Sequence, residues 1–313
     1  MLTMSRRELL AVAGAALAAG SPAPPNTPKI CIFSKHLQWL SVPDAAKLAA
    51  DIGFDGVDLT VRKGGHVEPS RVAQDLPAAV EAIRKTGLEV PMVTAGIVTA
   101  QSEHAGEILR TISSLGIHDY RWGGFSLDAG RSIPEQIESA RGAVRDLAAL
   151  NQSHRVCAMY HTHSGAGVLG ASIWDLYLLL QGFDPKVVGV NFDIAHATIE
   201  GGLGGWRNSA SLVAGITRGI ALKDFYWEKR ADGAWQPRWC PIGEGMVRFE
   251  EYFQSLRPGF RGPIQLHFEY PEMGGAEDGQ RSLSISRDQF RRQAERDLGR
   301  IRELMRKAGI ARG

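Results

Sequence analysis

Histidines and carboxylates occur together at three places in the second half of the sequence. Four of the nine histidines and two acidic residues stand at the ends of short apolar segments: His161, His163, Asp193, His196, His267 and Glu269. Imidazole nitrogens and carboxylate oxygens in one cleft are the ligands that Zn²⁺, Mn²⁺, Co²⁺ and Fe²⁺ take in proteins. Histidine also titrates near neutral pH and suits acid–base catalysis. A metal site or an acid–base site is therefore predicted, provided that the fold brings the segments together.

The spacing within the segments shows which side chains share a face. Residues i and i+2 of an extended strand point the same way, so His161 and His163 would face together, as would His267 and Glu269. This alternation favours three metal ligands, which are His161, Asp193 and Glu269. The other histidines would bind substrate or orient the ligands, although any could be a ligand instead; they are His163, His196 and His267.

A lysine ends a further apolar segment. Beside a carbonyl substrate, Lys223 could stabilise a developing enolate oxygen while Glu269 or His161 removes a proton. Four residues of the earlier segments could bind substrate hydroxyl groups, namely Lys35, Asp58, His66 and Trp122. Each of these four could equally be an ordinary loop or core residue.

These residues need a fold that gathers the ends of separate strands. Apolar strand-like segments alternate with amphipathic helical segments along the whole chain after residue 28. The strands are predicted at residues 29–34, 56–60, 89–94, 117–122, 155–161, 187–193, 219–224 and 263–270. The helices are predicted at residues 43–52, 72–86, 102–115, 134–150, 172–181, 209–217, 249–256 and 286–307. Eight alternating units predict one α/β domain, a closed (β/α)8 TIM barrel with its helices outside.

Two irregular segments interrupt the pattern. The longest insert, residues 226–247, follows the seventh strand and would lie at the carboxyl ends of the strands, where barrel enzymes build their sites. The glycine-rich segment 201–205 lacks the Lys-Ser/Thr pair of a phosphate-binding loop. A flexible lid or a tight loop is therefore favoured there over a phosphate cradle.

The first 27 residues read as an export segment and not as part of the domain at 28–313. Arg6 and Arg7 precede a short apolar run, and a proline-rich linker follows, which is typical of a twin-arginine signal peptide. The run is shorter than the roughly 20 residues that span a bilayer. We expect a periplasmic or secreted protein with no stable membrane anchor; the alternative is a disordered basic tail.

Composition narrows the partners. The 313 residues include 44% hydrophobic and 22% charged residues, an ordinary globular mixture. The net charge of +2 is too small for a nucleic-acid-binding surface. Three cysteines without a CxxC unit do not make a disulfide framework. The expected partner is a small sugar or polyol and no nucleic acid, while a homo-oligomer stays open.

The strand ends resemble the xylose isomerase-like TIM barrel superfamily of sugar phosphate isomerases and epimerases, which includes AP endonuclease family 2-like enzymes of the endonuclease IV type. The segments that carry the resemblance are residues 53–59, 161–165, 192–196, 222–224, 241–245 and 266–270. Together, the D-x-x-H after the sixth strand and the G-E-G after the seventh are moderately specific. The resemblance covers nearly the whole chain after residue 28.

The resemblance implies one divalent metal ion, Mn, Zn, Co or Mg, held by Glu, Asp, His and Glu from strands five to eight. Asp193 and Glu269 match this pattern. His161 stands where the first Glu would be, and Ala221 stands where the strand-seven His would be. Because family epimerases move protons with two glutamates on opposite faces of the substrate, His161 argues against a strict two-glutamate mechanism.

The preferred hypothesis is a metal-dependent isomerase or epimerase that abstracts a proton next to the carbonyl of a sugar, keto-sugar or polyol. A lyase or dehydratase of a keto-sugar or inosose begins with the same step, and His161 in a Glu position tilts toward it. A non-catalytic periplasmic sugar-binding barrel is the alternative from another class. A nuclease is disfavoured by the small net charge and the export signal.

Overall fold

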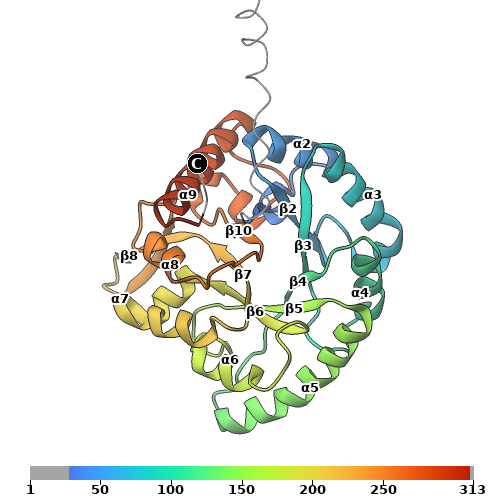
Figure 1. Ribbon diagram of the computed structural model, residues 1–313. Coiled ribbons are helices and arrows are strands. Elements are labelled where there is room, and N and C mark those ends of the chain that lie inside the picture. The colour runs from blue at the N-terminus through green and yellow to red at the C-terminus, as the bar shows by residue number, and fades with distance from the viewer. Residues whose placement is uncertain (1–27, 311–313) are drawn as a thin grey trace, which may run out of the picture.

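The computed structural model describes residues 28–310, and eight parallel strands form a closed barrel around its centre (Figure 1). The order around the barrel is β1-β10-β7-β6-β5-β4-β3-β2. Each barrel strand pairs with the barrel strands before and after it in the chain, and β10, the last, pairs with β1. The strands are β1 (Ile30–Phe33), β2 (Gly56–Val61), β3 (Glu89–Ala95), β4 (Asp119–Trp122), β5 (Cys157–His161), β6 (Val188–Asp193), β7 (Thr217–Leu222) and β10 (Ile264–Leu266). The predicted single-domain TIM barrel is confirmed.

Helices enclose the barrel in a ring (Figure 1). They are α2 (Val42–Ile52), α3 (Val72–Lys85), α4 (Ala105–Ser114), α5 (Ile133–His154), α6 (Ile173–Leu180), α7 (Ile194–Val213), α8 (Phe249–Ser255) and α9 (Arg287–Lys307). Within residues 28–310, no helix is long and apolar enough to cross a membrane. The predicted signal peptide and linker, residues 1–27, lie outside the described residues.

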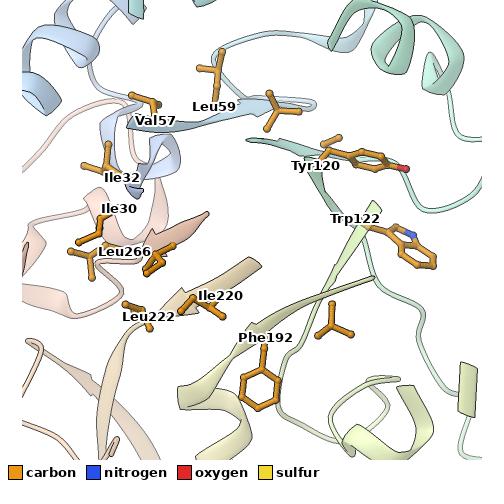
Figure 2. Close-up of a cluster of buried hydrophobic side chains, with 14 of the residues drawn as sticks. Ile30, Ile32, Val57, Leu59, Tyr120, Trp122, Phe192, Ile220, Leu222 and Leu266 are labelled. Atoms are coloured by element: carbon orange, nitrogen blue, oxygen red, sulfur yellow. The ribbon is translucent and has the colours of Figure 1, made fainter. Parts of the chain in front are cut away.

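The strands alternate between two buried faces. Apolar side chains such as Ile32, Leu59, Trp122 and Phe192 point outward from the barrel toward the helices (Figure 2). Each side chain of this kind stabilises the fold by roughly 1.5–3 kcal/mol. The intervening residues face the barrel interior, and toward its carboxyl end they become polar. The period-2 pattern therefore separates the residues that hold the barrel from those that can do chemistry.

Local signals fix the helix ends. The Ser41 side chain accepts a hydrogen bond from the Asp44 N–H and so caps α2, which ends at Gly53 in the left-handed region at φ 100°. Ser286 and Gln289 form a reciprocal capping box at the start of α9. Ser102, at the start of the helix predicted at residues 102–115, does not cap it, because its hydroxyl accepts from the Val98 and Thr99 N–H groups and α4 begins three residues later.

The prediction of a helix at residues 209–217 with a glycine-rich lid before it is wrong. Helix α7 starts directly after β6 and includes the glycine-rich segment, with one kink at Gly202. A side chain at Gly201 would place its Cβ 2.5 Å from the Trp206 backbone nitrogen, so the kinked helix needs glycine there. The glycines permit a bend in a helix and do not form a loop.

The insert at residues 226–247 is more ordered than expected. It folds as an antiparallel hairpin of β8 (Asp224–Lys229) and β9 (Trp235–Cys240), followed by a tight loop. The Asp224 carboxylate accepts hydrogen bonds from the backbone N–H groups of Phe225, Gly243, Gly245 and Val247. These hydrogen bonds connect the Lys-Asp motif at residues 223–224 to the Gly-Glu-Gly motif at residues 243–245, so Asp224 has a structural role.

Candidate active site

Side chains from four consecutive strand ends meet in the barrel mouth. The Nε2 of His161, at the end of β5, lies 3.6 Å from the Oδ2 of Asp193, at the end of β6. Lys223, just after β7, places its Nζ 3.4 Å from the same oxygen and 3.8 Å from the Oε2 of Glu269. The rings of His161 and His267 stack with centroids 5.6 Å apart. The predicted convergence of these segments is what the structure contains.

Asp193 serves two functions through its two oxygens. Its Oδ1 accepts hydrogen bonds from the Ala195 and His196 N–H groups and caps α7. Its Oδ2 faces His161 and Lys223 and has no hydrogen-bond partner among the described residues. The helix cap fixes the carboxylate so that one oxygen is presented to the mouth.

Two groups of residues have the geometry to hold a metal ion. The first is His161, His163 and His196, and the second is His161, Asp193 and His267. Within each group, one ligand atom per residue lies within 4.8 Å of the others. These groups overlap at His161, and neither contains Glu269, although Glu269 was predicted as a ligand.

Hydrogen bonding favours the second group. The Nδ1 of His196 accepts from the Ser164 N–H at 3.2 Å, so the proton of a neutral His196 lies on Nε2 and blocks it as a ligand. The Nε2 of His163 lies 3.2 Å from an Arg121 nitrogen, which can only donate to it. The Nε2 of His161 and both nitrogens of His267 also have no hydrogen-bond partner among residues 28–310, as is true of the protonated Nε2 of His196. The Nδ1 of His161 lies 3.1 Å from the Asn191 amide, whose unpartnered oxygen accepts from Nδ1–H once the amide is turned, and this leaves the His161 Nε2 free for a metal.

The same unpartnered atoms test whether a metal fits. Buried polar atoms without partners are costly, and here the Nε2 of His161, the Oδ2 of Asp193 and the nitrogens of His267 cluster in one place. Two imidazoles and one carboxylate form a ligand set suited to a divalent transition metal. The residues present therefore fit a metal ion, with His267 in the role predicted for Glu269.

Glu269 instead lies among cations and beside His267. Its Oε1 is 3.3 Å from the Lys35 Nζ and 3.7 Å from the His267 Nδ1. Burial would raise the pKa of Glu269, but Lys223 and Lys35 outweigh it and hold the pKa well below the ordinary value. A carboxylate next to the distal nitrogen of a ligand histidine orients that ligand.

The mouth histidines are neutral at neutral pH. Burial lowers the pKa of His161, His196 and His267 well below the ordinary value, and the nearby cations Arg121 and Lys223 lower it further. Burial together with Arg121 also lowers the pKa of His163, to about 4. Neutral imidazole is the form that binds metal.

Three other predicted substrate-binding residues lie elsewhere or are engaged. Trp122 packs outward against Phe125 and Tyr160, and its indole N–H donates to the Val98 carbonyl, so it belongs to the core between barrel and helices. The Nδ1 of His66 lies 3.2 Å from the Thr60 hydroxyl. Asp58 is fully buried and accepts from the Thr94 hydroxyl, and burial raises its pKa to about 7.

Sequence reasoning missed Arg121 in the mouth; for Arg62 a loop role, and for Trp239 surface packing, was an equal alternative to a place there. Arg121 of β4 and Arg62, which follows β2, place their guanidinium carbons 5.4 Å and 5.6 Å from the Phe33 ring centroid. Trp239 of the hairpin lies 5.5 Å from the His196 ring and 4.5 Å from the Lys223 Nζ. For Arg121 the signal was available, since Arg121 alternates with the outward-facing Trp122.

Trp239 forms a wall of the mouth, and its replacement should weaken catalysis. A desolvated cation–π contact contributes about 2 kcal/mol, so we expect Trp239→Ala to lower kcat/KM about 30-fold because Lys223 loses its position. Trp239→Phe should retain most of the activity. Trp235→Ala removes an exposed tryptophan from the same hairpin and is the matched control. Equal kinetics for the two alanine variants would contradict the role of Trp239.

His36 fixes the segment that carries His267 and Glu269. The ring is fully buried; its Nδ1–H donates to the Ala276 carbonyl and its Nε2 accepts from the Phe268 N–H. Burial lowers its pKa to about 3. Because the folded-state value lies below the unfolded value of 6.5, the stability due to neutral His36 is present above pH 6.5 and lost as the pH falls toward 3.

We therefore expect His36→Gln to change how stability depends on pH. The variant should unfold more easily than the unaltered protein at pH 7.5, since one buried hydrogen bond is weakened. As the pH falls from 6.5 to 4, the free energy of unfolding of the variant should decrease less steeply than that of the unaltered protein, and the two slopes should differ by about 1.4 kcal/mol per pH unit. Urea unfolding across this range measures both slopes, and parallel curves would contradict the prediction.

The barrel and its polar mouth define a class of protein, the (β/α)8 barrels whose sites lie at the carboxyl ends of the strands. Residues 46–304 match the family model described as xylose isomerase-like TIM barrel. The chain belongs to this family, as the resemblance of its strand ends indicated. A comparison with curated proteins gives no match.

Solved structures agree on the fold. The apo form of a 3-keto-D-glucoside 4-epimerase from E. coli is 14% identical, covers 88% of this chain and 99% of its own, and has a TM-score of 0.63. A probable 3-DHS dehydratase from Bacillus anthracis is 16% identical, with 85% and 97% covered and a TM-score of 0.61. A xylose isomerase-like barrel from Mycobacterium smegmatis in complex with magnesium is 13% identical, with 89% and 98% covered and a TM-score of 0.62.

Proposed function

We propose that this protein is a metal-dependent enzyme that moves a proton next to the carbonyl of a keto-sugar or an oxidised polyol, as an isomerase or epimerase does. One observation carries the proposal. The unpartnered ligand atoms of His161, Asp193 and His267 lie together in the mouth of the barrel, beside a buried lysine and a carboxylate. The similar epimerase from E. coli supports the reaction class, and the similar barrel with magnesium supports a metal.

The metal would be held by His161, Asp193 and His267, and when bound it would polarise a carbonyl or hydroxyl oxygen of the substrate. Lys223 presents its ammonium group to the same space and stabilises negative charge that develops on that oxygen. His196 carries a proton on Nε2, 4.0 Å from Asp193, and can donate it.

Glu269 is the carboxylate placed to accept a proton. Lys35 and Lys223 keep it ionised, which makes it available as a base but a weak one. When the substrate moves the lysines or shields them, its basicity rises. His163, whose Nε2 faces Arg121, is a second neutral imidazole in reach of the mouth.

A dehydratase is the second candidate, and one feature of the site favours it. Elimination of water needs a proton donor for the leaving hydroxyl, and His196 with its Nε2–H is such a donor. The similar probable dehydratase from Bacillus anthracis has the same fold. Isomerase, epimerase and dehydratase share the first step, so one assay tests that step for all three.

The test is proton exchange. The purified protein, loaded in turn with Mn²⁺, Zn²⁺, Co²⁺ and Mg²⁺, is incubated in D₂O with 3-keto-glucosides, ketohexoses and inososes, and NMR follows loss of the proton next to the carbonyl. Exchange that stops when a chelator is added supports the proposal. A product formed from the substrate by loss of water identifies the dehydratase.

Two outcomes would overturn the proposal. Absence of exchange with every metal and substrate, together with binding of the same sugars, would identify a non-catalytic sugar-binding barrel. Exchange that persists in metal-free protein would remove the metal from the mechanism and leave Lys223 as the electrophile.

A further inference from the structure

Two arginines at the barrel mouth have no carboxylate partner. Arg62 follows β2 and Arg121 lies in β4, and both are partly buried. Within residues 28–310 neither guanidinium lies within 4.0 Å of a carboxylate oxygen, whereas Lys35 and Lys223 are both paired with Glu269. Arg121 donates a hydrogen bond to the Nε2 of His163, whose ring is neutral. Arginine is rarely buried without a partner.

Both guanidinium groups approach the same aromatic ring. Their central carbons lie 5.6 Å and 5.4 Å from the centroid of Phe33, and the Lys35 Nζ lies 6.0 Å from it. The face of an aromatic ring attracts cations and so gathers them here. It supplies no hydrogen-bond acceptor, however, and leaves the N–H donors of Arg62, and those of Arg121 that do not bond His163, available to a ligand.

The charges around the ring favour an anion. Four cationic side chains meet three carboxylates in the mouth: Lys35, Arg62, Arg121, Lys223, Asp58, Asp193 and Glu269. Asp58 is fully buried, accepts from the Thr94 hydroxyl and is the carboxylate that acts most strongly on both arginines, so that one charge faces two guanidinium groups. Asp193 and Glu269 lie beside Lys223 and Lys35. A bound divalent ion would increase the positive excess. The mouth therefore lacks one negative group beside the arginines.

We infer that Arg62 and Arg121, which both approach Phe33, form an oxyanion-binding site next to the proposed metal ligand His267, so that the substrate carries a carboxylate or a phosphate group. Planar guanidinium groups bind both oxyanions through paired N–H donors. The inference rests on the proposed function and names the substrate class within it: a sugar acid or a sugar phosphate in place of a neutral sugar.

The test compares ligands that differ only in the terminal group. D-Glucitol, D-gluconate and D-glucitol 6-phosphate are titrated into the metal-loaded protein by calorimetry. We expect at least one of the two anions to bind about tenfold or more tightly than glucitol, because charge-assisted hydrogen bonds replace neutral ones. Preference for gluconate identifies a carboxylate substrate, and preference for the phosphate ester identifies a phosphorylated one.

Substitutions locate the site. Arg62→Gln and Arg121→Gln should each remove most of the anion preference, while Arg110→Gln, an exposed arginine on α4, should leave it unchanged. Far-ultraviolet circular dichroism checks that each variant is folded, and Arg62→Gln, outside the strands, keeps the test valid if Arg121→Gln is not. Equal binding of the three ligands, or an anion preference that survives both substitutions, would overturn the inference.

Failure of this inference is separable from failure of the proposed function. Metal-dependent proton exchange on keto-sugars, together with equal binding of the three titrated ligands, would keep the function and remove the oxyanion site. Arginine-dependent anion binding without exchange on any substrate would keep the site and remove the function.

Discussion

Replacement of Asp193 by asparagine should abolish metal binding and lower activity by a factor of about 100 or more, since even residues behind metal ligands contribute 10- to 100-fold. Asp193 is the only carboxylate in either of the two candidate metal groups found among residues 28–310. Asparagine removes the charge and turns one oxygen into an N–H₂ donor that cannot bind a cation. Metal content after dialysis, measured by inductively coupled plasma mass spectrometry, gives the result directly.

The asparagine variant separates metal binding from folding. Its remaining oxygen can still accept from the Ala195 and His196 N–H groups, and asparagine is as good a helix cap as aspartate. Asp193→Ala removes the cap as well and should cost a further 1 kcal/mol or so. Asp146→Asn, on the exposed face of α5, is the control. Full metal content in Asp193→Asn would show that the ligand set is wrong.

Two histidine variants distinguish the candidate groups. If the ligands are His161, Asp193 and His267, then His267→Gln loses the metal and His163→Gln keeps it. The reverse result would transfer the site to His161, His163 and His196. The hydrogen bonds from Ser164 to His196 and from Arg121 to His163 are the reason for the expected order.

Much of this site could be predicted because strand geometry is simple. Period-2 alternation places His161 and His163 on one face, and the parallel order of a barrel brings Asp193 and Lys223 beside them. These positions depend only on strand ends and direction. An error of two residues at the boundaries of β7, or of four at the carboxyl end of β10, changes none of them.

The remaining features depend on side-chain orientation and on contacts distant in sequence. Preference for His267 over Glu269 as a ligand follows from which buried nitrogens lack partners, and no spacing pattern contains that information. Trp239 reaches the mouth only because β8 and β9 pair as a hairpin. Helix α7 was missed because glycines favour loops in isolation, although Asp193 in a D-x-x-H pattern is also a capping signal.

Substitution of Lys223 by methionine should lower kcat about 10²- to 10³-fold, which is the usual effect of removing a group that stabilises an oxyanion. Lys223 is 4% exposed and lies between Asp193 and Glu269. Methionine fills similar space without the charge. Lys223→Arg keeps the charge but changes its position, so we expect its activity to fall between the two.

A structural effect must accompany the kinetic one, and its pH dependence identifies it. Lys223 is the strongest influence that lowers the pKa of Glu269. Because that pKa is lowered in the folded state, ionised Glu269 stabilises the fold at pH values above its ordinary pKa of 4.5. This stability is lost as the pH falls through the folded-state pKa. Lys223→Met should therefore destabilise the protein most at neutral pH, on the order of 3 kcal/mol, and less below pH 4.5.

The double variant Lys223→Met, Glu269→Gln decides between a structural and a catalytic lysine. Neutral glutamine needs no cation, so the double variant should regain most of the stability lost in Lys223→Met. Its activity should remain low, because glutamine cannot accept a proton and methionine cannot stabilise an oxyanion. Recovery of both stability and kcat would show that Lys223 only neutralises Glu269 and that neither group takes part in the chemistry. Because Glu269→Gln by itself removes the proposed base, the kcat of the double variant is compared with that of Glu269→Gln, and a further fall assigns to Lys223 a direct role at the reacting oxygen.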